Sequence, residues 1–155
     1  MIGGAETFRY FARKLEAERA EAAPIVVTIQ TDPERYLDAP LPPAWRTLGI
    51  VEGLCHAARL ELVRSPLRSL YLAQLAAAIA DGLSESYPRV MRAQAAAHAW
   101  KAISNAHRLA GRQDAALSAL DEAEKRIGGE LVLAFDRAIL ALARGFGQQS
   151  GCRDR

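Results

Sequence analysis

The sequence predicts an all-α fold in which antiparallel helix hairpins are stacked side by side. Apolar residues recur at helical spacing in several segments, and proline or glycine separates one segment from the next. Apolar residues make up 50% of the chain but aromatic residues only 6%, so alanine and the aliphatic side chains must build the core. Alanine has the highest helix propensity and lets helices approach closely. One short segment has the composition of a β-strand, and a lone strand has no ladder partner.

The N-terminal segment, residues 5–22, is predicted to form an amphipathic helix. Four of its apolar residues share one helical face: Phe8, Phe11, Ala12 and Leu15. Charged residues cover the rest of the surface. Pro24 is expected to end this helix, because the residue before a proline is disfavoured in the helical conformation.

The connection that follows combines one β-branched run with several prolines. We interpret residues 24–30 as an extended linker or a short helical piece. Thr31 and Glu34 have the spacing of a capping box, so a short helix is expected to begin there. The proline-rich residues 38–43 predict a rigid break.

Further helices are predicted after this break, over residues 44–63, 66–83, 89–110, 113–127 and 130–144. Ser65 is the expected N-cap of the second of these and Pro66 its first residue. Gly111 occupies the left-handed position that commonly follows a helix. We therefore divide the chain into an N-terminal helix and linker (1–43), a helical domain (44–147) and a disordered tail (148–155).

The charge of the chain is nearly balanced. The formal net charge is +2, which does not by itself indicate a polyanionic partner. Residues 65–110 hold 5 basic and 2 acidic side chains, so the middle of the chain is mildly basic. This segment makes a nucleic-acid-associated accessory protein the alternative to a protein-binding function.

Cysteine content and hydropathy indicate a cytoplasmic protein. The chain has two cysteines, Cys55 and Cys152, which is not the pattern of a disulfide framework. The first residues lack the apolar core of a secretory signal, and no apolar run reaches the length of about 18 residues that a membrane span needs. We expect no contact with a membrane.

The residues that often carry chemistry do not combine into a reactive set. Cys55 and His56 are adjacent and point about 100° apart on a helix. His98 and His107 fall on opposite helical faces, and no set of four zinc ligands exists. A Cys55 nucleophile has no identifiable base. We therefore expect no enzymatic activity, no cofactor and no metal, with Cys55 as a buried structural residue.

Residues 97–130 resemble a tetratricopeptide repeat (TPR), a helix–turn–helix unit of about 34 residues. The positions that match the repeat are Trp100, Ile103, His107, Gly111, Ala116, Leu120 and Ala123. Ser104 stands where the family usually has glycine or alanine, and Gly128 where proline is common. One repeat later, Gly145 again falls at the turn position. More loosely, residues 14–127 are similar to a group of bacterial TPR-like proteins.

The resemblance implies a short α-solenoid and an adaptor that holds a peptide or a helix in a concave groove. The groove positions of the repeat are His98, Lys101, Asn105 and Arg108, which share one helical face. Lys101 and Asn105 also match the pair with which some TPR proteins hold a terminal carboxylate, because an ammonium supplies charge and an amide supplies a directed donor. Asp136 stands where the next repeat would supply a second asparagine. We expect an acidic peptide or an acidic protein surface as the ligand.

The predicted helix at residues 130–144 is apolar on both faces. Its groove-facing positions are Val132, Phe135, Ile139 and Leu142, and its opposite face carries Leu131, Ala134, Ala138 and Ala141. A helix that is apolar all round is buried on both sides, whereas the terminal repeat of a solenoid normally has a polar outer face. We expect either a partner protein or self-association at this surface, or an N-terminal helix that folds over it.

These observations favour a non-enzymatic adaptor or a regulatory subunit of a larger complex.

Overall fold

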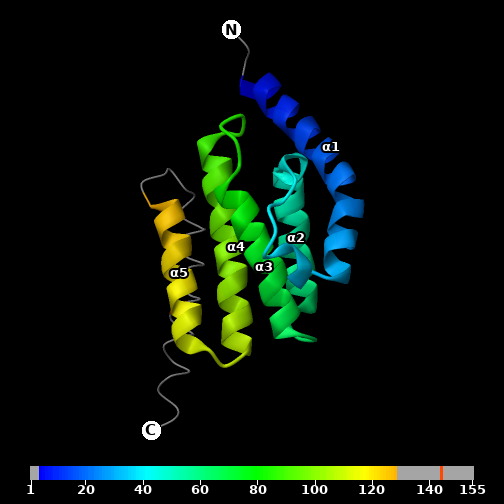
Figure 1. The fold of residues 1–155 in the computed structure, drawn as a ribbon. Helices are drawn as coiled ribbons and strands as arrows, with labels where there is room; N and C mark the ends of the chain where they lie inside the picture. Colours follow the sequence, from blue (N-terminus) through cyan, green and yellow to red (C-terminus); the bar gives the residue numbers. More distant parts are fainter. Residues whose placement is uncertain (1–3, 129–143, 145–155) are drawn as a thin grey trace.

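The computed structural model describes residues 4–128 and residue 144, and every regular element in this part of the chain is helical. Its α-helices lie side by side (Figure 1): α1 (Gly4–Thr31), α2 (Leu48–Glu61), α3 (Pro66–Asp81), α4 (Arg89–Leu109) and α5 (Gln113–Ile127). Two short 3₁₀ helices, η1 (Glu34–Tyr36) and η2 (Pro43–Trp45), lie in the connection between α1 and α2. The prediction of an all-α fold is confirmed.

Successive helices from α2 to α5 run antiparallel to one another along the chain, whereas α1 runs parallel to α2 (Figure 1). Gly49 of α2 lies against the backbone of Glu18, and Gly53, one turn later, lies against Val26. Contacts therefore advance in the same direction along both helices. The connection through η1 and η2 leads the chain back from the C-terminal end of α1 to the level of Glu18, where α2 begins. The antiparallel arrangement predicted from the sequence does not extend to α1.

Pro24 does not end the first helix as the sequence predicted, because α1 continues to Thr31. An interior proline costs a helix about 3 kcal/mol. Beyond the proline, however, Val26 and Ile29 are buried against the rest of the protein. Burying two such side chains stabilises the fold by about 1.5–3 kcal/mol each, enough to offset the proline. Residues 24–30 are therefore helical rather than an extended linker.

The close approach of α1 to α2 requires two glycines. A Cβ atom added to Gly49 would lie 2.7 Å from the carbonyl carbon and oxygen of Glu18, and one added to Gly53 would lie 2.7 Å from Cγ2 of Val26. The two glycines are one helical turn apart, so they form a smooth strip along one face of α2. At Gly49 the strip meets the backbone of α1 at Glu18 and Arg19, and at Gly53 it meets the side chain of Val26.

The centre of the core is α3, which has buried residues on all of its faces. These residues are Ser69, Leu70, Leu72, Ala73, Leu75, Ala76, Ala77, Ile79 and Ala80. The Ser69 hydroxyl donates a hydrogen bond of 2.6 Å to the carbonyl oxygen of Ala58 in α2. A buried hydroxyl must find such a partner, because desolvating it without one costs free energy. Alanine-rich packing and this bond hold α2 and α3 close together.

Side-chain caps set the start of α2 and α3. The Thr47 hydroxyl accepts a hydrogen bond from the backbone nitrogen of Ile50, so α2 begins at Leu48 and not at residue 44 as expected. Ser65 caps α3 in the same way, and Pro66 is its first residue, which confirms both predictions.

The hairpin of α4 and α5 turns at Gly111, whose φ of 76° is the left-handed conformation predicted for it. The backbone nitrogen of Arg112 donates to the carbonyl of His107 at 2.8 Å, which closes the end of α4. Ser104, which departs from the TPR pattern, donates from its hydroxyl to the carbonyl of Ala116 in α5 at 2.8 Å. A hydroxyl at this position therefore strengthens the hairpin.

A second, smaller apolar cluster lies between α4 and α5. It is formed by Ala97, Leu120, Ala123 and Ile127, with Trp100 and Leu117 packed against it. Trp100 also packs against the main core, so it lies where the two clusters meet. Ile103, three residues further along α4, belongs to the main core.

We predict that Gly49→Ala destabilises the protein by about 1–3 kcal/mol, the usual cost of inserting a methyl group into a packed contact. Denaturant unfolding followed by circular dichroism measures the change. Gly82→Ala is the matched control, because a Cβ atom there meets its nearest neighbour, Ala78 O, at an ordinary 3.5 Å. Equal stability of the two variants would show that α1 does not rest on Gly49.

Candidate interaction groove

A cavity of about 540 Å³ lies between α2 and α4. Its lining residues are Glu52, Cys55, His56, Ala58, Arg59, Leu62, Ser69, His98, Lys101, Ala102 and Asn105. Three of the four residues predicted to line a groove, His98, Lys101 and Asn105, are thus brought together here. Arg108, the fourth, is exposed and does not line the cavity.

Two further hollows continue this cavity toward the N-terminal end of α1. The next, of about 270 Å³, shares Glu52, Cys55 and His98 with the first. A third, of about 480 Å³, shares Leu15 and Met91 with the second. We call the three together the long groove, and its parts, in this order, the basic, middle and apolar sections.

Helix α4 forms a continuous wall of the long groove. Its lining residues are Met91, Gln94, Ala95, His98, Lys101, Ala102 and Asn105. Steps of three or four residues place all of them on one helical face. The distance from Met91 to Asn105 along the helix axis is about 21 Å, at about 1.5 Å per residue.

The charged residues of the basic section give it an excess of positive charge. Glu52 forms an ion pair with Arg19 of α1, with 2.7 Å between Oε2 and Nε. Arg59 donates from Nη2 to Nδ1 of His56 at 3.2 Å. Arg59 and Lys101 both contribute a cation to the lining, whereas among the described lining residues Glu52 supplies the carboxylate and is paired with Arg19. This end of the groove is therefore suited to an anionic group.

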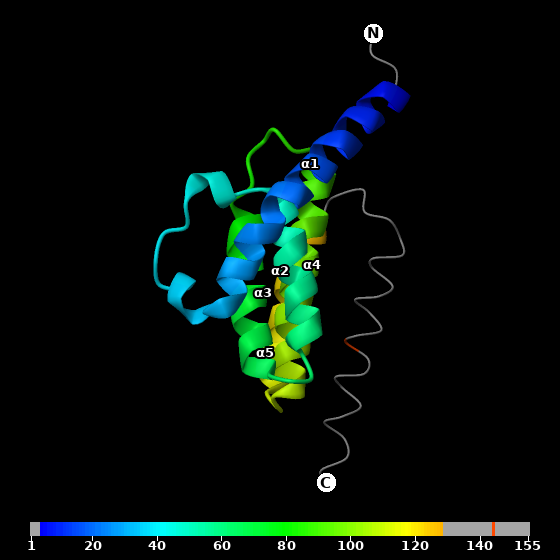
Figure 2. The same ribbon diagram turned by 90° about the vertical axis from the view of Figure 1, so that its right-hand side faces the viewer.

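The apolar section lies under the N-terminal half of α1, which extends beyond the other helices (Figures 1 and 2). Its apolar lining residues are Phe8, Phe11, Ala12, Leu15, Pro88 and Met91. The face predicted from the sequence of α1 therefore meets the start of α4. The Phe8 side chain remains 75% exposed, so the apolar section is open to solvent.

Tyr87, in the loop that precedes α4, joins α1 to α2 beside the groove. The hydroxyl donates to Oε1 of Glu18 in α1 at 2.6 Å and accepts a bond of 3.3 Å from the backbone nitrogen of Leu48 in α2. The ammonium of Lys14 lies 4.5 Å from the centre of its ring. Burial, together with the bond to Glu18, raises the pKa of Tyr87 to about 12, so the hydroxyl stays protonated at neutral pH and keeps both bonds.

The contribution of α2 to the groove was not predicted from the sequence. Glu52, His56 and Arg59 are spaced by four and three residues, which makes a polar stripe on an otherwise apolar helix. That stripe was visible in the sequence. Its position opposite His98 and Lys101 was not, because it depends on how α2 and α4 pack.

Cys55 lines the groove as an unreactive thiol. Desolvation by burial raises the pKa of Cys55 to about 12, and the nearby Arg59 cation only partly opposes this effect. The thiolate is the nucleophilic form of cysteine, so at neutral pH Cys55 is protonated and contributes a small apolar surface. The residue is half-buried and lines the groove, so it is less enclosed than the sequence predicted.

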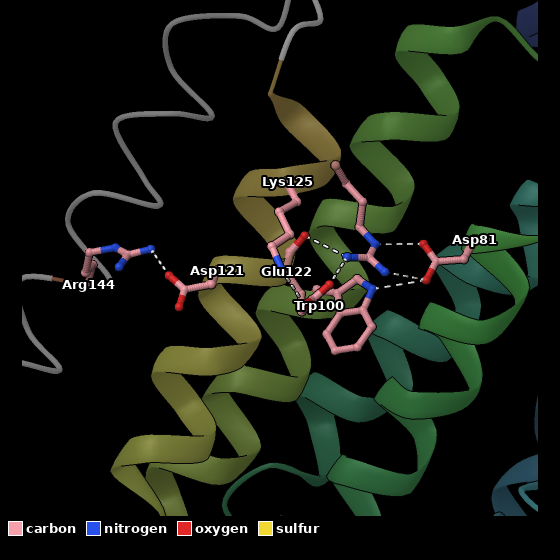
Figure 3. Close-up of polar contacts among 7 residues, drawn as sticks. Asp81, Trp100, Asp121, Glu122, Lys125 and Arg144 are labelled. Atoms are coloured by element: carbon pink, nitrogen blue, oxygen red, sulfur yellow. Dashed lines mark hydrogen bonds and ion pairs between the residues drawn. The ribbon is translucent and has the colours of Figure 1, made fainter.

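On the other side of α4, a polar network joins α3, α4 and α5 (Figure 3). The guanidinium of Arg126 donates to both oxygens of Asp81, at 2.8 and 2.9 Å, and to Oε2 of Glu122 at 2.6 Å. It also lies 4.5 Å from the centre of the Trp100 ring, and the Trp100 indole donates to Asp81 at 3.3 Å. These contacts raise the pKa of Arg126 above its usual value. The network fixes the orientation of α4 and so of its groove face.

The predicted apolar interface, Val132, Phe135, Ile139 and Leu142, lies outside the described residues, as does Asp136. Arg144 is described, and its guanidinium donates to Asp121 of α5 at 2.7 Å (Figure 3). It also donates to Glu124 of α5 at 2.9 Å. These ion pairs are solvent-exposed and contribute about 0–1 kcal/mol each.

In residues 4–128 and 144, no three histidine, cysteine or carboxylate side chains meet as a metal site requires. No helix of this described part combines the length and the apolar character needed to cross a bilayer.

Comparison with protein-family models, with curated proteins and with solved structures finds no match for the chain. The TPR resemblance and the function that it implies therefore stay predictions.

We predict that Cys55 reacts slowly with a thiol reagent such as DTNB at pH 8 in the folded protein. Because burial raises its pKa to about 12, the rate should still increase with pH well above 9, and unfolding should make the reaction fast. The measurement uses the Cys152→Ser variant, so that Cys55 alone reports. A rate that levels off below pH 9 would contradict the buried thiol.

Proposed function

We propose that the chain is a non-enzymatic protein-interaction module, an adaptor or regulatory subunit, that holds an acidic segment of a partner protein in the long groove. The proposal rests on the basic section, a cavity of about 540 Å³. In it, His98, Lys101 and Asn105 of α4 lie opposite Arg59 of α2. Concave sites with an apolar floor and a few convergent polar groups are the usual place for a ligand.

We further propose that the architecture is a short TPR-like solenoid. The antiparallel pairs α2–α3 and α4–α5 support it, because their first helices, α2 and α4, run in the same direction and line one groove, as the first helices of TPR units do. Helix α1 is not part of this pattern. It lies parallel to α2 and extends the groove at one end.

The remaining parts of the proposal come from the sequence alone. We propose a cytoplasmic location, and a second contact with a partner or another copy of the chain through the apolar residues predicted at 131–142. The bacterial origin of the similar TPR-like group makes a bacterial protein part of the same proposal.

We predict that Arg59→Glu combined with Lys101→Glu lowers recovery of the protein partner at least about tenfold, because reversing two charges in the groove turns attraction into repulsion. Affinity purification from the native cells, with quantitative mass spectrometry, measures recovery. Arg64→Glu is the control, since Arg64 is exposed and lies outside the groove lining. Unchanged recovery with the double variant would refute the proposed function.

A second function, as a nucleic-acid-associated accessory protein, is supported by a cavity of about 290 Å³ whose lining includes Arg89, Arg92, Lys125 and Arg126. Asp81 also lines it and, with Glu122, pairs with Arg126, while Glu122 also pairs with Lys125. Much of the positive charge is thus already compensated, which is why we place this function second.

Salt dependence separates the two functions. Nucleic-acid binding through several phosphate contacts weakens by orders of magnitude between about 50 and about 200 mM salt. The adaptor is expected to keep a stoichiometric protein complex at the higher concentration and to retain no RNA or DNA. Retention of nucleic acid that disappears with salt and with Arg92→Glu would favour the second function.

A further inference from the structure

We propose that the long groove binds its partner segment in one orientation only, with an acidic end in the basic section and an apolar end in the apolar section. This inference rests on the proposed function, because it specifies which chemistry of the partner lies against which residues. The occupant is a segment of another protein in which apolar residues and carboxylates are segregated along its length.

The two ends of the long groove differ in chemistry. At one end, Arg59 and Lys101 bring positive charge, and Asn105 adds an amide donor. At the other end the lining is mainly aliphatic and aromatic, with Phe8 and Met91 among its residues. Arg19 also lines the second end, but its guanidinium is paired with Glu52. A carboxylate therefore gains more from the first end than from the second, where burial beside apolar side chains costs free energy.

The middle section connects the two ends without a charged barrier across its floor. Leu48, Val51, Ala95 and Cys55 line it, and the Cys55 thiol is protonated. Among the described residues of this lining, Glu52 supplies the carboxylate and is paired with Arg19, while Gln94 and His98 add polar groups from α4. The apolar lining residues of the middle section therefore connect the two ends for an apolar stretch of the partner segment.

Length and openness fit a segment of moderate size. The α4 wall spans about 21 Å, which is covered by about 14 residues in a helix. Phe8 is 75% exposed although it lines the apolar section, and large exposed apolar side chains grouped in one place mark interaction surfaces. A matched partner would cover Phe8 and pair with Arg59 and Lys101 at the same time.

The test uses two synthetic peptides of about 14 residues with one composition, long enough to span the groove as helices. In the segregated peptide, leucine and phenylalanine occupy one half and glutamates the other, and in the interspersed peptide the same residues alternate. Fluorescence anisotropy with the full chain should show at least about tenfold tighter binding of the segregated peptide. A photoreactive group at its acidic end should cross-link to α2 or α4 near Lys101, and one at its apolar end to α1 near Phe8.

Two variants with matched controls locate the ends. Arg59→Glu should weaken binding of the segregated peptide about tenfold and reduce its salt dependence, whereas Arg64→Glu should not. Phe8→Ser should weaken it with unchanged salt dependence, whereas Val27→Ser should not, because Val27 is an exposed apolar residue of α1 that lies outside the groove lining. Circular dichroism checks that both α1 variants keep their helix content.

Equal affinities of the two peptides, no binding of either peptide, or cross-links from the acidic end to α1 would each overturn the orientation. If the natural partner is then still lost on reversal of Arg59 and Lys101, the proposed function stands and only this inference fails. If the partner is retained on that reversal, the proposed function fails as well.

Discussion

The contact of α1 with the glycine strip of α2 is the constraint on which the rest of the structure depends. Neither glycine has room for a side chain, because Gly49 lies against the backbone of α1 at Glu18 and Gly53 lies against the side chain of Val26. Because α1 runs parallel to α2, its free N-terminal half projects over the start of α4 (Figure 2). This placement adds the apolar section to a groove that α2 and α4 alone would leave without an aromatic end.

Polar contacts at the helix junctions keep this arrangement in register. The Tyr87 hydroxyl joins α1 to the start of α2 through Glu18 and Leu48. The guanidinium of Arg68 in α3 donates to the carbonyl oxygen of Gln30, so the last turn of α1 is also tied to the core. Both ends of the contact between α1 and the helical body are therefore fixed, and the interior proline of α1 is accommodated between them.

The sequence predicted the parts of the fold that depend on local signals. Ser65 with Pro66 and Gly111 each act within one helical turn, and the structure confirms each. The course of the chain after Pro24 was mispredicted because burial of Val26 and Ile29 outweighs a local helix breaker. The same distinction between local signals and packing holds for the candidate groove. Residues on one helical face of α4 were predicted, whereas the α2 residues opposite them and the parallel course of α1 depend on packing between helices.

The most direct test of the account is whether a partner segment occupies the space between α2 and α4. A photoreactive amino acid in place of His98, which lines both the basic and the middle sections, samples this space in living cells. The same amino acid in place of Arg64 is the comparison. The account predicts an adduct with another protein, at a stretch that carries carboxylates, from position 98 alone. Products confined to the chain itself, or identical products from both positions, would contradict it.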